Sequence, residues 1–104
     1  MATTRIQPKL DEKTQVLTIT VNGAFDYDSV YAFRAAYEGH EVAPREVVVD
    51  LRQTEAIDSA ALGMLLNMKR NLGLGDQQIR IINAPADVRR VLEIARFDKK
   101  FRIE

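Results

Sequence analysis

The chain has 104 residues, of which 46% are hydrophobic and 29% are charged, the size and composition of a single soluble globular domain spanning residues 1–104. Fifteen basic and fifteen acidic residues cancel, so the net charge gives no reason to expect direct binding to nucleic acid or to an anionic membrane. No cysteine is present, which excludes disulfides and thiolate metal sites, and the sequence has neither a signal-peptide core nor the ~20 apolar residues of a membrane span, so we expect a cytoplasmic protein.

Two strands and a helix are predicted in the first part of the chain. Residues 5–11 and 14–22 have the pattern of strands. In the second of them, aliphatic residues alternate with mostly polar ones. The short polar link between the two strands favours an antiparallel hairpin. Apolar residues then recur at helical spacing after a turn glycine, which predicts a helix over residues 28–38.

The second part of the chain alternates strands and helices. Residues 45–52, "REVVVDLR", carry three consecutive valines, which is typical of a strand covered on both faces. The helix that follows ends at Gly73, a residue that suits the left-handed position after a helix. The predicted elements after the valine strand are a helix over 59–72, a strand over 77–83, a helix over 84–95 and a short edge strand over 99–104. The order β-β-α-β-α-β-α-(β) indicates an α/β domain with one mixed sheet, in which an antiparallel hairpin precedes parallel strands.

Residues suited to catalysis or metal binding are few. His40, the single histidine, lies beside a glycine and is expected to be a solvated loop residue. Ser59 lacks the flanking glycines of a nucleophile elbow, and the sequence positions no base for it. Asp26 and Asp28 are acids one residue apart, which is weak evidence for a cation site and stronger evidence for a cap on the following helix. We therefore expect no enzymatic activity, no metal and no cofactor.

The stretch "AIDSAALGML", residues 56–65, leads into the helix predicted over 59–72. One side of this helix is apolar on a helical wheel and is expected to face the core: Ala61, Leu62, Leu65, Leu66, Met68 and Leu72. Lys69 falls within this apolar arc and is expected to extend its ammonium group to solvent. The other side lacks the charged residues of an ordinary solvent face and carries Ala60, Gly63, Met64, Asn67 and Asn71.

This weakly charged side, next to the hydroxyl of Ser59, is predicted to be a docking surface. Gly63 in a helix interior costs roughly 1 kcal/mol relative to alanine, a cost that is easier to understand if a partner approaches the backbone closely. Asp58 and Ser59 are also the residue types expected to cap a helix. The two interpretations are compatible, because a serine in the first turn can start a helix and also accept a phosphate, which the positive end of the helix tolerates.

The segment "VVVDLRQTEAIDSAALGMLL" resembles the signature of the STAS domain of bacterial anti-sigma factor antagonists. In that family a strand ending in Asp-Leu or Asp-Phe precedes a turn and helix similar to Asp-Ser-Ser-Gly-Leu-Gly. The resemblance extends along nearly the whole chain, through the opening hairpin, "VNGAFD" before the first helix and "NAPADVRRVLEIARFDKKFRI" near the end. It implies a single STAS-like domain with a mixed sheet, helices packed mainly on one face, and no catalytic activity.

The resemblance also implies roles for individual residues. It implies that Ser59 is phosphorylated by a partner serine kinase and dephosphorylated by a PP2C-like phosphatase. Asp58 corresponds to the motif aspartate, and Asp26 matches the acid that follows the second strand. The unphosphorylated form would bind an anti-sigma factor and so free the sigma factor. Ala60 and Ala61 replace the second serine and the glycine of the motif, which leaves the phosphate acceptor in place and the identity of the partner open.

Two functions follow as alternatives. In the first, the protein is a phosphorylation-switched anti-sigma factor antagonist that regulates transcription and docks its partner while Ser59 is unphosphorylated. The expected partner-binding residues are Asp26, Asp58, Ser59, Ala60, Gly63, Met64 and Asn67. In the second, the protein is a constitutive STAS subunit of a transporter or a multi-protein signalling complex, and Ser59 is only a helix cap. Partner binding that is lost in Ser59→Asp and kept in Ser59→Ala distinguishes the first from the second.

Overall fold

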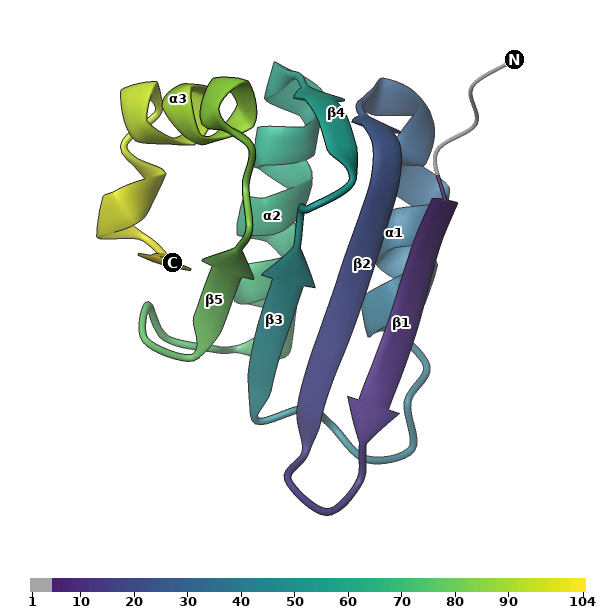
Figure 1. Cartoon of the computed structure of the whole chain (residues 1–104). Coiled ribbons are helices and arrows are strands. Elements are labelled where there is room, and N and C mark those ends of the chain that lie inside the picture. The colour runs from purple at the N-terminus through teal and green to yellow at the C-terminus, as the bar shows by residue number, and fades with distance from the viewer. Residues whose placement is uncertain (1–4) are drawn as a thin grey trace.

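A six-stranded sheet forms the centre of the molecule (Figure 1). The structure is a computed structural model that describes residues 5–104, so residues 1–4 of the predicted domain lie outside the described part. The strands are β1 (Arg5–Asp11), β2 (Val16–Phe25), β3 (Glu46–Asp50), β4 (Thr54–Ile57), β5 (Ile79–Ile82) and β6 (Arg102–Ile103). The helices are α1 (Val30–Tyr37), α2 (Ser59–Leu72) and α3 (Ala86–Ile94), with the short 3-10 helices η1 (Tyr27–Ser29) and η2 (Phe97–Lys99).

The sheet is mixed, as the order of the elements predicts. Its strands run in the order β1-β2-β3-β5-β6; β1 is antiparallel to β2, and the later pairs are parallel. The register places Leu17 beside Val47 and Val47 beside Ile79, and all three side chains are fully buried. Because alternate residues of a strand point to opposite faces, this row belongs to the apolar face of the sheet. The expected α/β domain, with an opening hairpin followed by parallel strands, is therefore confirmed.

The helices cover the sheet from one side and from one end. Figure 1 shows α1 and α2 side by side behind the sheet, with α3 lying beyond the end of β5. An aromatic row joins β2 to α1, in which the ring centroids of Phe25 and Phe33 are 5.0 Å apart and those of Phe33 and Tyr37 are 5.9 Å apart. Leu65 and Met68 of α2 are fully buried in the same core. This packing holds the first turns of α1 and α2 at the same end of the sheet.

Several element boundaries differ from those predicted. The strand β4 was not predicted; it pairs with the end of β2 and is held by a hydrogen bond of 2.7 Å from Thr54 Oγ1 to the carbonyl of Val21. In addition, β2 runs to Phe25 instead of ending at residue 22, and the first helix is a 3-10 turn before it becomes α-helical at Val30. The prediction for Gly73 is confirmed, because this residue follows α2 with a φ of 65°.

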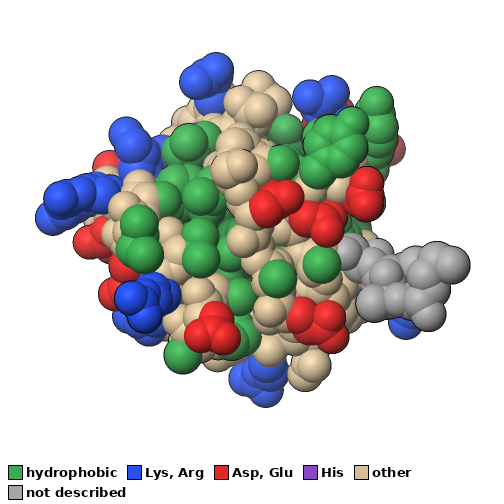
Figure 2. Space-filling view, turned by 90° about the horizontal axis from the view of Figure 1, so that it is seen from above, with side chains coloured by type: hydrophobic (Ala, Val, Ile, Leu, Met, Phe, Trp, Pro, Cys, Tyr) green, Lys and Arg blue, Asp and Glu red, His purple; other side chains and the backbone are tan. Residues whose placement is uncertain are grey.

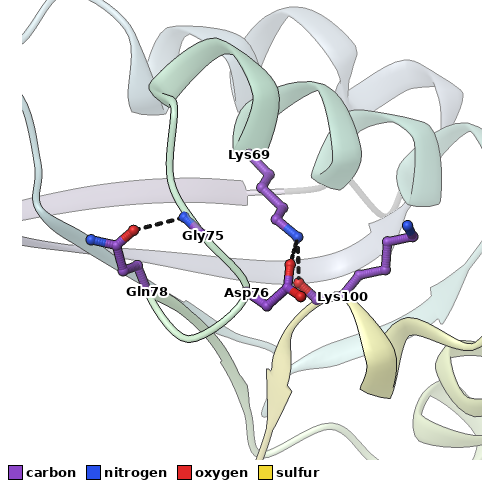
Figure 3. A network of polar contacts seen from close by, with 5 residues as sticks. All are labelled: Lys69, Gly75, Asp76, Gln78 and Lys100. Carbon is purple, nitrogen blue, oxygen red and sulfur yellow. Dashed lines mark hydrogen bonds and ion pairs between the residues drawn. The ribbon is translucent and has the colours of Figure 1, made fainter.

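Lys69 finds specific partners instead of simply extending into solvent. Its ammonium group donates hydrogen bonds to the carboxylate of Asp76 and to the carbonyl oxygen of Lys100, the second at 2.8 Å (Figure 3). The same group lies 5.4 Å from the ring centroid of Phe101, so α2 is tied to the following loop and to the C-terminal segment. The hydrogen bond and the positive charge of Lys69 lower the pKa of the Asp76 carboxyl group.

Candidate functional site

The candidate site lies at the end of the sheet where β2 and β4 finish and where α1 and α2 begin (Figure 1). Asp58 joins these segments through both oxygens of its carboxylate. Its Oδ1 accepts a hydrogen bond of 2.9 Å from the Ala61 N–H, which makes Asp58 the N-cap of α2. Its Oδ2 accepts a hydrogen bond of 3.2 Å from the Tyr27 N–H, which holds η1 against the start of α2. The carboxylate of Asp58 therefore connects η1 to the first turn of α2.

Ser59 is the first residue of α2 and its side chain is exposed. The sequence allowed either Asp58 or Ser59 to cap this helix, and in the structure the capping hydrogen bond comes from Asp58. Within residues 5–104, the Ser59 hydroxyl has no hydrogen-bond partner. The hydroxyl is therefore accessible to solvent, and its loss would remove no hydrogen bond that holds the helix.

Asp26 lies next to this corner but is engaged locally. Its Oδ1 accepts a hydrogen bond of 3.0 Å from the Asp28 N–H, while its own N–H donates to the Ser29 hydroxyl at 3.2 Å. These two bonds form a capping box around η1. Asp26 thus has the capping role that the sequence favoured, and Tyr27, the residue after it, brings it close to Asp58.

Ala60, Gly63 and Asn67 lie on the part of α2 that was predicted to be a docking surface. Asn67 is exposed, while Ala60 and Gly63 are half-buried. A Cβ atom placed on Gly63 would meet no heavy atom within 4 Å outside its own stretch of helix. The packing of the chain itself therefore does not require glycine at this position.

Met64 does not face solvent, and the prediction that it does is wrong. Its side chain is only 7% exposed and lies between α1 and α2 beside Phe33 and Tyr37. Two turns further along α2, Asn71 Nδ2 donates a hydrogen bond of 3.1 Å to the Tyr37 hydroxyl. The helical wheel assumed one buried side, whereas α2 packs against both the sheet and α1, which widens its buried arc.

Two exposed tyrosines accompany the acidic residues at this end of the molecule. Tyr27 is 73% exposed and Tyr31 is 82% exposed. Figure 2 views the molecule from this end and shows acidic side chains beside hydrophobic ones. Neither tyrosine was predicted to be a site residue, although Tyr31 directly follows Val30 and therefore points away from the apolar stripe of α1.

His40 lies away from this corner, in the loop after α1. It was expected to be a solvated residue, but it is half-buried, and its Nε2 lies 2.8 Å from the carbonyl oxygen of Ala36. Among residues 5–104, no group of three or more histidine, cysteine, aspartate or glutamate side chains is placed to hold a metal ion. None of the helices in this described part has the length and apolar character needed to cross a membrane.

Comparisons with known proteins agree with this architecture. The family model for the Mlab STAS domain matches residues 9–103. A STAS-domain containing protein of Pseudomonas aeruginosa (strain UCBPP-PA14) is 43% identical to the chain over 89 residues, which is 86% of this chain and 88% of that protein. The similarity covers the strand, turn and helix that carry Asp58 and Ser59, since the family match spans them.

Solved structures with the same fold include anti-sigma factor antagonists. A structure described as an anti-sigma factor antagonist of Thermotoga maritima superposes with a TM-score of 0.76 and 19% identity, over 94% of this chain and 84% of that one. The anti-sigma factor antagonist SpoIIAA of Bacillus, in its unphosphorylated form, gives a TM-score of 0.69 and 17% identity, over 96% of this chain and 87% of that one. At such identities the likeness shows the fold, while the family model and the Pseudomonas relative show the family: this chain is a member of the STAS domain family.

Proposed function

We propose that this protein is a phosphorylation-switched anti-sigma factor antagonist, which binds an anti-sigma factor or a related signalling protein while Ser59 is unphosphorylated and thereby regulates transcription. The observation that carries this proposal is the division of roles between two neighbours. Asp58 provides the cap of α2, and the exposed hydroxyl of Ser59 has no partner among residues 5–104. The resemblance of the motif around Ser59 to that of anti-sigma factor antagonists supports this assignment, as does the similarity of the fold to SpoIIAA, which has been solved both with and without its phosphate.

A phosphate on Ser59 would act on the surface of the domain more than on its fold. It would add about −1.5 to −2 charges in the first turn of α2, where the free N–H groups and the positive end of the helix dipole accommodate an anion. The same phosphate would stand next to Asp58 and near Asp26, so the local charge would become strongly negative. A partner that packs closely on Ser59, Ala60 and Gly63 would have to desolvate this charge, and binding would fall.

The proposal also includes the enzymes that act on Ser59 and the residues that extend the partner surface. A serine kinase partner adds the phosphate, a PP2C-like phosphatase removes it, and the exchange takes place in the cytoplasm. The protein itself carries out no reaction and needs no cofactor. Asn67 extends the partner surface along α2, whereas Met64 supports that surface from beneath by packing against α1.

The experiment begins with the protein isolated from its native host, as wild type and as Ser59→Ala. Intact-mass spectra should show a phosphate adduct in the wild type only. A partner co-purified with Ser59→Ala is then titrated with each variant, and Ser59→Asp should bind at least about tenfold more weakly, which corresponds to about 1.4 kcal/mol. Gln77→Glu, which adds a negative charge in the exposed loop after α2, should bind as the wild type does.

A constitutive STAS subunit of a transporter or signalling complex would behave differently. It would co-purify with its partner in fixed stoichiometry, and neither Ser59→Asp nor Ser59→Ala would change the affinity. That result, or the absence of any phosphate on Ser59 under all growth conditions, would overturn the switch.

A further inference from the structure

We propose that the groove between β4 and α3 is a second docking subsite, which takes a segment of the signalling partner that carries aliphatic side chains next to lysine or arginine. This inference rests on the proposed function, because it describes a further part of the same partner interface. It concerns a surface that the sequence analysis did not single out.

The groove has an apolar floor close to the switch residue. It has a volume of about 260 Å³ and is lined by Ala56 and Ile57 of β4 and by Val88 and Val91 of α3. This volume is below the ~300 Å³ at which small-molecule sites begin, so the groove suits one or two side chains better than a cofactor. Ile57, which lines the groove, lies two residues before Ser59, so the groove begins close to the switch residue in the chain.

The apolar surface continues out of the groove along α3. Val91 and Ile94 lie three residues apart on one side of the helix, and Ile94 is 73% exposed. It is the most exposed large aliphatic side chain in residues 5–104. Figure 2 shows hydrophobic side chains gathered on this end of the molecule. Together with the apolar floor of the groove, Ile94 forms a continuous exposed apolar surface, and such surfaces are typical of sites that bind other proteins.

Charge at the groove selects the kind of partner. Glu55 and Asp87 stand on opposite sides of it, one on β4 and one in the first turn of α3. Both are exposed, and neither forms an ion pair with another residue in the range 5–104. A segment with lysine or arginine beside its aliphatic residues would complement both the floor and the rim.

The number of residues in a stable protein interface supports a docking surface that extends from Ser59 to the groove. A stable interface needs about 20–30 residues on each side. Because Met64 is withdrawn between α1 and α2, the surface around Ser59 is smaller than the sequence suggested. The groove and Ile94 lie on the α3 side of Ser59 and supply additional contact area on the same end of the molecule.

The test is an NMR titration of the full-length, isotope-labelled protein with two synthetic peptides. One has the sequence Lys-Leu-Ser-Leu-Lys and the other has glutamate in place of both lysines. At peptide concentrations up to about 1 mM, the basic peptide should shift the amide signals of residues 55–57 and 87–94, and the acidic peptide should not. Ile94→Ser should weaken binding of the basic peptide by about fivefold. Val42→Ser, which also removes an exposed aliphatic side chain but lies in the loop after α1, should not.

Absence of shifts in the groove, shifts confined to other acidic surfaces, or equal binding of the acidic peptide would each overturn this inference. These outcomes are separate from those of the switch, because the titration uses neither the natural partner nor a Ser59 variant. If Ser59→Asp weakens partner binding but the basic peptide does not bind the groove, only the proposed docking subsite is refuted. If the basic peptide binds the groove but Ser59→Asp does not change the affinity for the partner, only the phosphorylation switch is refuted.

Discussion

Replacing Gly63 with alanine is expected to stabilise the isolated protein and to weaken its partner binding. Gly63 lies inside α2, and a methyl group there would meet no heavy atom within 4 Å outside the local helix backbone. Glycine in a helix interior is less favourable than alanine by roughly 0.5–1 kcal/mol, because the unfolded chain loses more backbone freedom when it folds. Since the added methyl group causes no clash, the free energy of unfolding should rise by about this amount.

Thermal and urea unfolding, followed by circular dichroism, measure the gain. For a domain of this size 1 kcal/mol shifts Tm by roughly 4–8 °C, so Gly63→Ala should raise Tm by roughly 2–8 °C. Gly73→Ala is the matched control, because a Cβ on Gly73 also meets nothing within 4 Å. Its φ of 65° is left-handed, however, and a Cβ in that conformation costs roughly 1–2 kcal/mol. The two alanine variants should therefore change stability in opposite directions.

A Tm for Gly63→Ala that is unchanged or lower than that of the wild type would refute the reasoning about the helix backbone. The partner titration then tests the reason for keeping the glycine. Gly63→Ala should bind about tenfold more weakly, as expected when a methyl group is forced into a close contact, and Gly73→Ala at the far end of α2 should bind normally. A stabilised Gly63→Ala variant with unchanged affinity would show that no partner approaches this backbone closely.

Three further predictions concern the capping, packing and polar contacts of α2, and urea unfolding measures all of them. Asp58→Ala should lower the free energy of unfolding by about 1–2 kcal/mol because it removes the cap of α2, whereas Ser59→Ala should change it by less than about 0.5 kcal/mol. An equal loss in both variants would make the serine a cap as well. Met64→Ala should cost about 2–4 kcal/mol, since the side chain is buried between two helices, and a cost near zero would contradict that packing. The pKa of Asp76 is lowered in the folded protein by its lysine partner, so its carboxylate contributes stability above the ordinary aspartate pKa. Wild type should therefore be more stable than Asp76→Asn at neutral pH, and this difference should vanish as the pH falls through the lowered pKa.

The fold could be predicted for those strands in which buried side chains follow a regular pattern along the sequence. Alternation along β2 places Leu17, Ile19 and Val21 on one face, and all three are fully buried. The valines of β3 were expected to be covered on both faces, and even Val48, on the outer face, is only 6% exposed. In both strands the side chains that decide the pattern lie within a few residues of one another, so the local sequence was sufficient to predict them.

The strand β4 could not be found in this way. Its four residues include only one buried side chain, Thr54, and the hydrogen bond that holds it reaches Val21, far back in the sequence. The position of Met64 was missed for a related reason, because its burial depends on how closely α1 approaches α2. Both errors concern contacts between distant segments, which no periodicity within one segment records.

One variant, Ser59→Asp, distinguishes an effect of negative charge on partner binding from an effect on folding. Both oxygens of the Asp58 carboxylate are already used, one by α2 and one by η1, and neither bond involves Ser59. An added negative charge at Ser59 gains from the helix dipole about what it loses by repulsion from Asp58, so the free energy of unfolding should stay within about 1 kcal/mol of the wild-type value. Partner binding should nevertheless be lost. A Ser59→Asp protein that binds poorly because it is largely unfolded, as circular dichroism would reveal, would contradict a mechanism that acts only on the surface.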